Sequence, residues 1–330
     1  MSMLAAAVVA AVTAAGHLDT TLTVKTGARL EVSNFSGGVS VSTWDKNAVR
    51  VAADFGGRTR VTLDPSPTTL RVNSEGQRGT AGVVDYQITM PSWMGIEVSG
   101  PFTDVDVVGS RGDVKVETVK GDVSVNGGNG VLELNTVQGD IALAGSKGRI
   151  KLNTINGDIT LAHIMGQLTT ESVNGDQVMD DVQLDALESS SVSGDLWFNG
   201  ALKSDGRYHL QSHNGDIDVV APDKPNAVIS VSTFSGEFNS DFDVTFTGTN
   251  GHREMQFTLG EGGPRLELES FSGNIRLLKS GAVEALRTRL RGQAGQPAPK
   301  APETPKPPKS SKSSKPPKAP TPPKPPNNED

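Results

Sequence analysis

The residues with the clearest chemical potential are carboxylates that follow a glycine in a short recurring phrase, Val/Ile-x-Gly-Asp. Successive aspartates are 18 residues apart from Asp122 to Asp176, and the spacing then widens to 19 and 21 residues. A fixed period of this length indicates a repeat architecture. The residues of these predicted repeat corners are Gly121, Asp122, Gly139, Asp140, Gly157, Asp158, Gly175, Asp176, Gly194, Asp195, Gly215 and Asp216.

Repeats stacked in register would bring neighbouring carboxylates to about 5 Å from one another. That is near the separation of the acid and the nucleophile in retaining glycosidases, and such a row could also bridge calcium. Catalysis, however, needs two carboxylates in different environments, and every repeat offers the same one. An aspartate in a tight turn also has a local role, because its side chain bonds backbone N–H groups. We therefore expect structural corners, with no catalytic, cofactor-binding or metal-ligating residue.

Two other motifs invite a functional interpretation. Arg111-Gly-Asp113 spells an integrin-type tripeptide, but we expect it in the same corner position as the other repeats. His209, Gln211 and His213 could suggest a metal site. Since His213 occupies the apolar corner slot and breaks the alternation, these side chains are not expected to converge on one ion. The chain contains no P-loop, dinucleotide fingerprint, nucleophile elbow or His-Glu-x-x-His motif.

Short strands must position the corners. Around Asp158, apolar Ile150 and Leu152 alternate with polar residues, and Ile159 and Leu161 do so after the corner. This alternation is typical of strands with one buried face. Each period also contains a second, Gly-rich corner, so two strands and two corners make one coil. Because one coil has almost no interior, the sequence predicts a stack, an all-β β-solenoid with coils of about 18–21 residues. An antiparallel sandwich is the rival interpretation.

The composition fits narrow coils better than a globular core. The 330 residues include 37 Gly, 5% aromatics and no Cys, which excludes disulfides, thiol catalysis and thiolate metal sites. The formal net charge is −7, yet from Gln293 onward seven Lys face three acidic residues. The preceding residues are therefore strongly acidic, which argues against nucleic acid as a partner.

Both ends of the chain depart from the repeat. Residues 1–16 contain an uncharged apolar run that we interpret as a signal peptide, although a basic region before it is missing. Residues 17–104 predict a strand-rich N-terminal cap with a first repeat, 105–279 the solenoid repeats, and 280–292 a short amphipathic helix. Residues 293–330 hold 13 of the 20 Pro among Lys and Ser, and we expect a disordered, extended tail. The tail is either a spacer or a salt-sensitive ligand of an anionic envelope polymer.

The chain resembles the bacterial DUF4097 family, which is described as adhesins with β-strand repeats and without an established biochemical activity. The resemblance covers roughly residues 18–278. It rests on the opening 30–41, on 44–51, on Tyr86-Gln-Ile-Thr-Met-Pro91, and on the repeated Val/Ile-x-Gly-Asp-Ile/Val. It implies adhesion and brings no catalytic residues.

We expect a non-enzymatic, exported protein of the periplasm or cell surface that binds polysaccharide or protein through a repetitive polar face. The mature chain is expected to have no membrane span. One alternative is a polysaccharide lyase or hydrolase, whose groove would lie at the irregular stretch 178–187 with Asp180 and Asp181. Another is a cytoplasmic self-assembling scaffold.

Overall fold

The computed structural model describes residues 16–57, 59–76, 79, 81–249 and 254–282. The chain divides into two units, 1–283 and 284–330, and the second unit lies outside the described residues. Residues 1–15 of the predicted signal peptide, nearly all of the predicted C-terminal helix and the Pro/Lys tail also lie outside them, whereas Gly16 begins the first strand. Within the described ranges the only helix is a 3-10 turn, η1 (Ser280–Ala282). The described residues therefore contain no helix long and apolar enough to cross a membrane.

The strands form two rows of parallel strands that face each other across a narrow core. Row 1 contains, in spatial order, β6 (Thr69–Gly76), β2 (Arg29–Ser33), β8 (Gly95–Gly100), β10 (Val114–Thr118), β12 (Asn129–Asn135), β14 (Lys147–Asn156), β16 (Met165–Asn174), the second parts of β17 (Gln177–Ser193) and β18 (Leu196–Asn214), β24 (Arg265–Ser270) and β20 (Ala227–Thr233). Row 2 contains β7 (Val84–Pro91), β3 (Ser36–Trp44), β9 (Phe102–Ser110), β11 (Val123–Gly127), β13 (Ile141–Ala144), β15 (Ile159–Ala162), the first parts of β17 and β18, β19 (Ile217–Ala221), β25 (Ile275–Lys279) and β21 (Phe238–Ser240).

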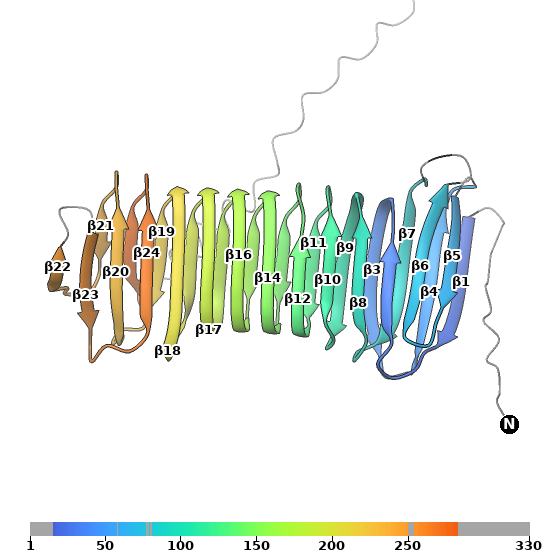
Figure 1. Ribbon diagram of the computed structural model, residues 1–330, viewed down its shortest axis with the longest axis horizontal. Coiled ribbons are helices and arrows are strands. Elements are labelled where there is room, and N and C mark those ends of the chain that lie inside the picture. Colours follow the sequence, from blue (N-terminus) through green and yellow to red (C-terminus); the bar gives the residue numbers. More distant parts are fainter. Residues whose placement is uncertain (1–15, 58, 77–78, 80, 250–253, 283–330) are drawn as a thin grey trace, which may run out of the picture. The chain divides into compact units, whose positions relative to one another are not determined.

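Each coil follows one row-1 strand, turns at a Gly-Asp corner, which we call corner 1, follows one row-2 strand, and turns back at corner 2 (Figure 1). Neighbouring strands within a row are parallel and keep an 18-residue register in the middle of the stack, so that Leu132 pairs with Ile150 and Ile150 with Leu168. The fold is therefore the predicted β-solenoid, which is confirmed over the sandwich.

The core is built from the alternating apolar residues of both rows. Leu132, Ile150 and Leu161 are at most 1% exposed, as expected for side chains that point into the stack from a pleated strand. Next to corner 1, a column of hydroxyl side chains lines the core edge. The Thr136 Oγ1 donates to the Gly121 carbonyl at 3.3 Å, and the Thr154 Oγ1 donates to the Gly139 carbonyl at 3.4 Å. These bonds satisfy buried polar groups where the backbone bends.

The order of coils at both ends differs from their order in the sequence. The coil of β2 and β3 lies between β8/β9 and β6/β7, and the coil of β24 and β25 lies between β18/β19 and β20/β21. The stretch 69–91, which the sequence suggested to be part of a cap, thus contributes a full coil. Similar corner phrases do not specify which coil stacks on which.

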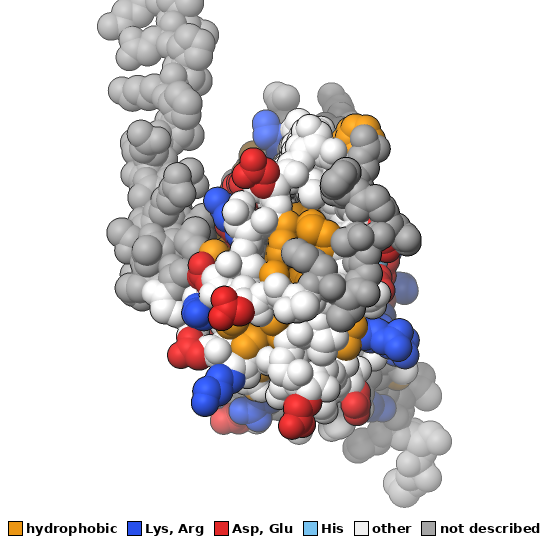
Figure 2. Space-filling view, turned by 90° about the vertical axis from the view of Figure 1, so that its left-hand side faces the viewer, with side chains coloured by type: hydrophobic (Ala, Val, Ile, Leu, Met, Phe, Trp, Pro, Cys, Tyr) orange, Lys and Arg blue, Asp and Glu red, His pale blue; other side chains and the backbone are white. Residues whose placement is uncertain are grey.

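Antiparallel strands close both ends of the stack. At one end β4 (Ala48–Phe55) pairs with β7, β1 (Gly16–Thr23) pairs with β4, and β5 (Thr59–Pro65) pairs with β6. At the other end β23 (Glu254–Leu259) pairs with β20, and β22 (Phe246–Thr249) pairs with β23. Viewed onto this second end, acidic and basic side chains lie around the periphery and uncharged ones in the middle (Figure 2). Such caps protect the edge strands of the stack from pairing with other chains.

Candidate functional site

The Gly-Asp corners form one column along corner 1. The Oδ1 of each aspartate accepts a hydrogen bond from the backbone N–H in the same slot of the next coil. The series runs from Asp104 through Asp122, Asp140, Asp158, Asp176, Asp195 and Asp216 to Asn274, with N···O distances of 2.8–3.0 Å. The Asn274 Oδ1 continues it to the Glu237 N–H at 3.1 Å. These side chains therefore join successive coils.

The glycine before each aspartate is required by the close approach of the coils. A Cβ on Gly157, whose φ is +154°, would lie 2.0 Å from the carbonyl oxygen of Gly139. The corresponding contact at Gly215 would be 2.0 Å from the Gly194 oxygen. Any side chain at this position would force the coils apart. The structure thus places all the predicted corner residues in a single aligned column, with Gly and Asp in distinct roles.

From Asp122 to Asp195 the column offers each carboxylate nearly the same surroundings, with one oxygen engaged by the neighbouring backbone. Asp216 differs, because its carboxylate also lies 3.5 Å from the Arg276 Nη2 and accepts from the Asn274 Nδ2 at 3.3 Å. Among the rungs from Asp122 to Asp195, two carboxylates in contrasting environments, which an acid/base pair requires, do not occur. Among the residues that the structure describes, no group of three or more His, Cys, Asp or Glu side chains could hold a metal ion. The column is therefore better suited to linking coils than to chemistry.

The two acids proposed for an enzyme groove lie at or beside corner 2. The Asp181 Oδ2 is 2.6 Å from the His163 Nδ1, and the Asp180 Oδ1 accepts from the Asn199 Nδ2 at 2.7 Å. His163 and Asp181 both have left-handed φ angles, 56° and 53°. Aspartate tolerates that conformation, and the contact between the two side chains ties the two coils together at this corner.

The position expected for the Arg-Gly-Asp tripeptide was wrong. Gly112 and Asp113 precede β10, a row-1 strand, and so lie at corner 2, opposite the Gly-Asp column. The Asp113 Oδ1 accepts from the Val131 N–H of the next coil at 2.9 Å. The reason is the half-coil offset between Asp113 and Asp122, which places the two acids on opposite edges.

The histidines of the suggested metal motif take part in separate contacts. The His213 ring stacks on Phe271 with 4.8 Å between centroids, and Phe271 stacks on Phe234 with 4.7 Å. The His209 Nδ1 is 3.9 Å from a Glu267 carboxylate oxygen. His213 therefore occupies the apolar corner slot, as the sequence predicted.

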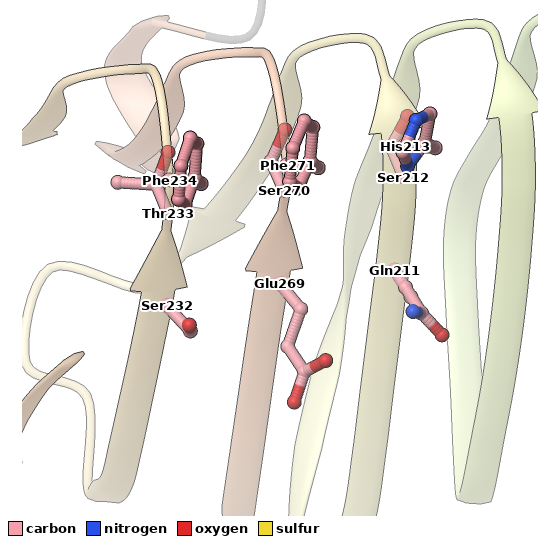
Figure 3. A pocket seen from close by; sticks show the side chains of 9 residues that line it. All are labelled: Gln211, Ser212, His213, Ser232, Thr233, Phe234, Glu269, Ser270 and Phe271. Atoms are coloured by element: carbon pink, nitrogen blue, oxygen red, sulfur yellow. The ribbon is translucent and has the colours of Figure 1, made fainter. Parts of the chain in front are cut away.

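The outward face of row 1 carries two neighbouring hollows. The first, of about 340 Å³, lies where the stacked rings meet the strands, with Gln211, Glu269 and Ser232 projecting beside them from β18, β24 and β20 (Figure 3). The second, of about 530 Å³, is lined by Gln167, Leu168, Thr169, Ala186, Leu187, Glu188, Arg207, Tyr208, His209, Arg265 and Glu267. Both hollows include β18 and β24, which pair in parallel.

Outside these hollows, the same face shows ladders of polar side chains. Along one column, the Arg71 Nε lies 2.8 Å from a Glu31 oxygen, and the Lys115 Nζ lies 3.3 Å from a Glu97 oxygen. Hydrogen bonds to Glu117 and Glu97 raise the pKa of Lys115. Opposite charges on neighbouring strands stabilise the sheet, and their heads remain available at the surface.

Sequence reasoning identified the corner column but missed the two hollows. Nothing in the sequence places Arg207 beside Arg265, because the two strands become neighbours only through the exchanged order of the last coils. A weak signal for the ring stack was available. Phe234 and Phe271 replace the aliphatic residue of the corner phrase that His213 also replaces.

Three solved structures are similar to this chain at low identity. A crystal structure of a putative adhesin from Bacteroides fragilis NCTC 9343 is 14% identical, with a TM-score of 0.41, 81% of this chain and 98% of that chain covered. A crystal structure of a putative cell adhesion protein from Clostridium sporogenes ATCC 15579 is 9% identical, with a TM-score of 0.23. The match covers 80% of this chain and 100% of that chain. A crystal structure of a putative lipid binding protein from Parabacteroides distasonis ATCC 8503 is 11% identical, with a TM-score of 0.30. The match covers 78% of this chain and 96% of that chain.

No curated protein matches the chain. The family model described as Toastrack DUF4097 matches residues 18–278, nearly all of the described solenoid and its caps. The chain belongs to the DUF4097 (Toastrack) family.

Proposed function

We propose that the protein is a non-enzymatic, exported envelope protein that binds its partner in an adhesin-like way through the outward face of row 1. The observation that carries this proposal is the register of that face. Asn135 and Asn153 are cross-strand neighbours, and the same column continues with polar residues of varying type in the adjoining coils, so a polar group recurs at this position in each of them. The spacing between them is about 4.8 Å.

A repetitive partner is the natural match for such a surface. Many weak contacts, each within reach of the next, give a combined affinity much larger than any single contact provides. We therefore propose a polysaccharide or an extended protein surface as the ligand. In this proposal the Gly-Asp corners are structural, since their carboxylates link the coils.

The domain division belongs to the same proposal. Residues 1–16 would be removed on export, 17–104 would contribute the N-terminal cap together with the first coils, and 105–279 the remaining repeats. Residues 280–292 would form a short helix, and 293–330 would act as a spacer or as a ligand of anionic envelope polymers. N-terminal sequencing of the native protein tests the first point, because export with cleavage predicts a mature start near residue 16 or 17. An uncleaved Met1 would favour a cytoplasmic scaffold.

Binding to the solenoid face is tested with the purified full chain and envelope polysaccharides of graded length. Affinity should rise with polymer length, and Asn153→Glu on the row-1 face should weaken it. Thr160→Glu, on the row-2 strand of the same coil, is the matched control and should leave binding unchanged. Equal effects of both substitutions would contradict the assignment to row 1. Cleavage of uronate polymers that Asp180→Ala or Asp181→Ala abolishes would establish the enzyme instead.

A further inference from the structure

Two arginines lie side by side in the larger hollow of row 1. Arg207 on β18 and Arg265 on β24 are direct partners in the parallel register, and both are exposed. Neighbouring parallel strands are about 4.8 Å apart, so the two guanidinium groups can reach one small ligand together. Within the described strands, this is the one cross-strand pair in which both partners are basic.

The pair is not neutralised by the protein. Among the described residues, no carboxylate oxygen lies within 4.0 Å of a guanidinium nitrogen of Arg207 or Arg265. Arg71 and Lys115, on the same face, do have acidic partners. Like charges on directly opposed strand positions destabilise a sheet. This arrangement in an acidic solenoid therefore costs stability, and it leaves two groups capable of bidentate hydrogen bonding in the lining of the hollow.

The hollow exists because the repeat is interrupted here. The register between β16 and β17 shifts between Gly166 and Gln167, and that between β17 and β18 shifts between Leu184 and Ala186. Ala186, with its short side chain, is the partner of Arg207 on the other side. The phenol of Tyr208 is buried beneath, where it donates to the Leu184 carbonyl at 2.8 Å. The arginines consequently stand at the edge of a depression with a rigid floor.

The remaining polar lining indicates which anion fits. Glu188 and Glu267 also line the hollow, together with Gln167 and Thr169. Carboxylates would repel a bare phosphate, but they accept hydrogen bonds from hydroxyl groups. A ligand that presents one carboxylate to the arginines and several hydroxyls to the glutamates and amides satisfies both parts of the lining.

We propose that this hollow binds an acidic sugar residue of a polysaccharide, a uronate, with Arg207 and Arg265 holding its carboxylate. The inference rests on the proposed function and assigns a ligand class to one part of the row-1 face. Glu188, Thr169 and Gln167 take the sugar hydroxyls, and neighbouring sugar units extend along the ladders of the same face.

The test is calorimetric titration of the full chain with oligogalacturonate, with its methyl ester and with inorganic phosphate. Oligogalacturonate should bind, the methyl ester at least tenfold more weakly, and phosphate should fail to compete. Arg207→Gln and Arg265→Gln should each lower the affinity about tenfold or more, as expected for the loss of charged hydrogen bonds. Arg149→Gln, in the same outward column but outside the hollow, removes the same charge where only a neighbouring sugar unit can reach, and should lower the affinity clearly less than either hollow variant.

Folding of the variants is checked by thermal unfolding, in which Arg207→Gln should not lower the midpoint, since it removes a repulsion. Equal binding of ester and free acid, equal loss in Arg149→Gln, or competition by phosphate at comparable affinity would each overturn the uronate site. In those cases length-dependent binding of a neutral polymer would still support the proposed function. Absence of binding to every polymer would refute both.

Discussion

Substituting alanine for Gly157 should destabilise the solenoid strongly, because this glycine sets the distance between coils. The new Cβ would lie 2.0 Å from the Gly139 carbonyl oxygen, and real Cβ atoms essentially never come closer than 3.0 Å to another heavy atom. Overpacking of this kind costs about 1–3 kcal/mol, and the positive φ of +154°, which residues with a side chain rarely adopt, adds about 1–3 kcal/mol. We expect a loss of about 3 kcal/mol in the free energy of unfolding.

Two matched substitutions separate the causes. Gly27→Ala keeps the positive φ, 88°, but meets nothing within 4 Å, so only the conformational cost of about 1–2 kcal/mol remains. Gly57→Ala meets nothing and has no positive φ, so it should change stability by less than about 0.5 kcal/mol.

The assay is urea unfolding followed by circular dichroism, with thermal midpoints as a second measure. For a unit of this size 1 kcal/mol corresponds to about 2–4 °C, so Gly157→Ala should melt about 6–12 °C below the wild type. A loss in Gly157→Ala no larger than that in Gly27→Ala would refute the close contact. The aligned corner column would then be wrong.

Three further predictions follow from single contacts. Asp158→Ala should lower the free energy of unfolding by about 1 kcal/mol and speed hydrogen exchange of the Asp176 amide, which loses its acceptor. Asp158→Asn should be nearly neutral, because the amide oxygen of asparagine can accept the same hydrogen bond. Arg276→Ala should cost about 2–4 kcal/mol by leaving the Asp218 carboxylate, 11% exposed, without its partner, and Asp218→Asn should restore part of the loss in denaturant unfolding. Burial raises the pKa of both tyrosines, Tyr86 and Tyr208. The unfolded chain therefore releases these protons first, and stability should fall as pH rises above about 10; tyrosinate absorbance that appears in the native protein near pH 10, before unfolding, would contradict this.

The sequence predicted the coil well because two local signals agree in every repeat. Alternation around Asp158 determines which side chains face inward, and the Gly-Asp phrase marks where the chain turns. Both signals act over a few residues and recur at a fixed period, so few arrangements of the coils other than a stack in register fit the sequence. For the same reason the corner column could be predicted residue by residue.

Corner 2 was harder to predict. Its left-handed position is occupied by Gly145, His163 and Asp181 in successive coils. Of these three residues, only Gly145 is of a type whose presence in a sequence predicts a left-handed conformation. The bond between His163 and Asp181 compensates for the unfavourable backbone, and a contact between separate coils leaves no local trace in the sequence.

The exchanged order of the last coils shows why the candidate ligand site was beyond sequence reasoning. Val228 on β20 and Arg207 on β18 both take Arg265 as their cross-strand partner, on opposite sides of β24. If the coils stacked in chain order, β20 would lie directly on β18, and Arg207 would face Val228 instead of a second arginine. The insertion of β24 between them thus creates the basic pair.

Because the corner phrases of β20 and β24 are alike, their order must be decided by long-range packing, and the antiparallel pairing of β23 with β20 requires β20 to be the outer coil. A solenoid can in this way acquire one distinctive site without losing its repeat, simply by changing which coil lies next to which.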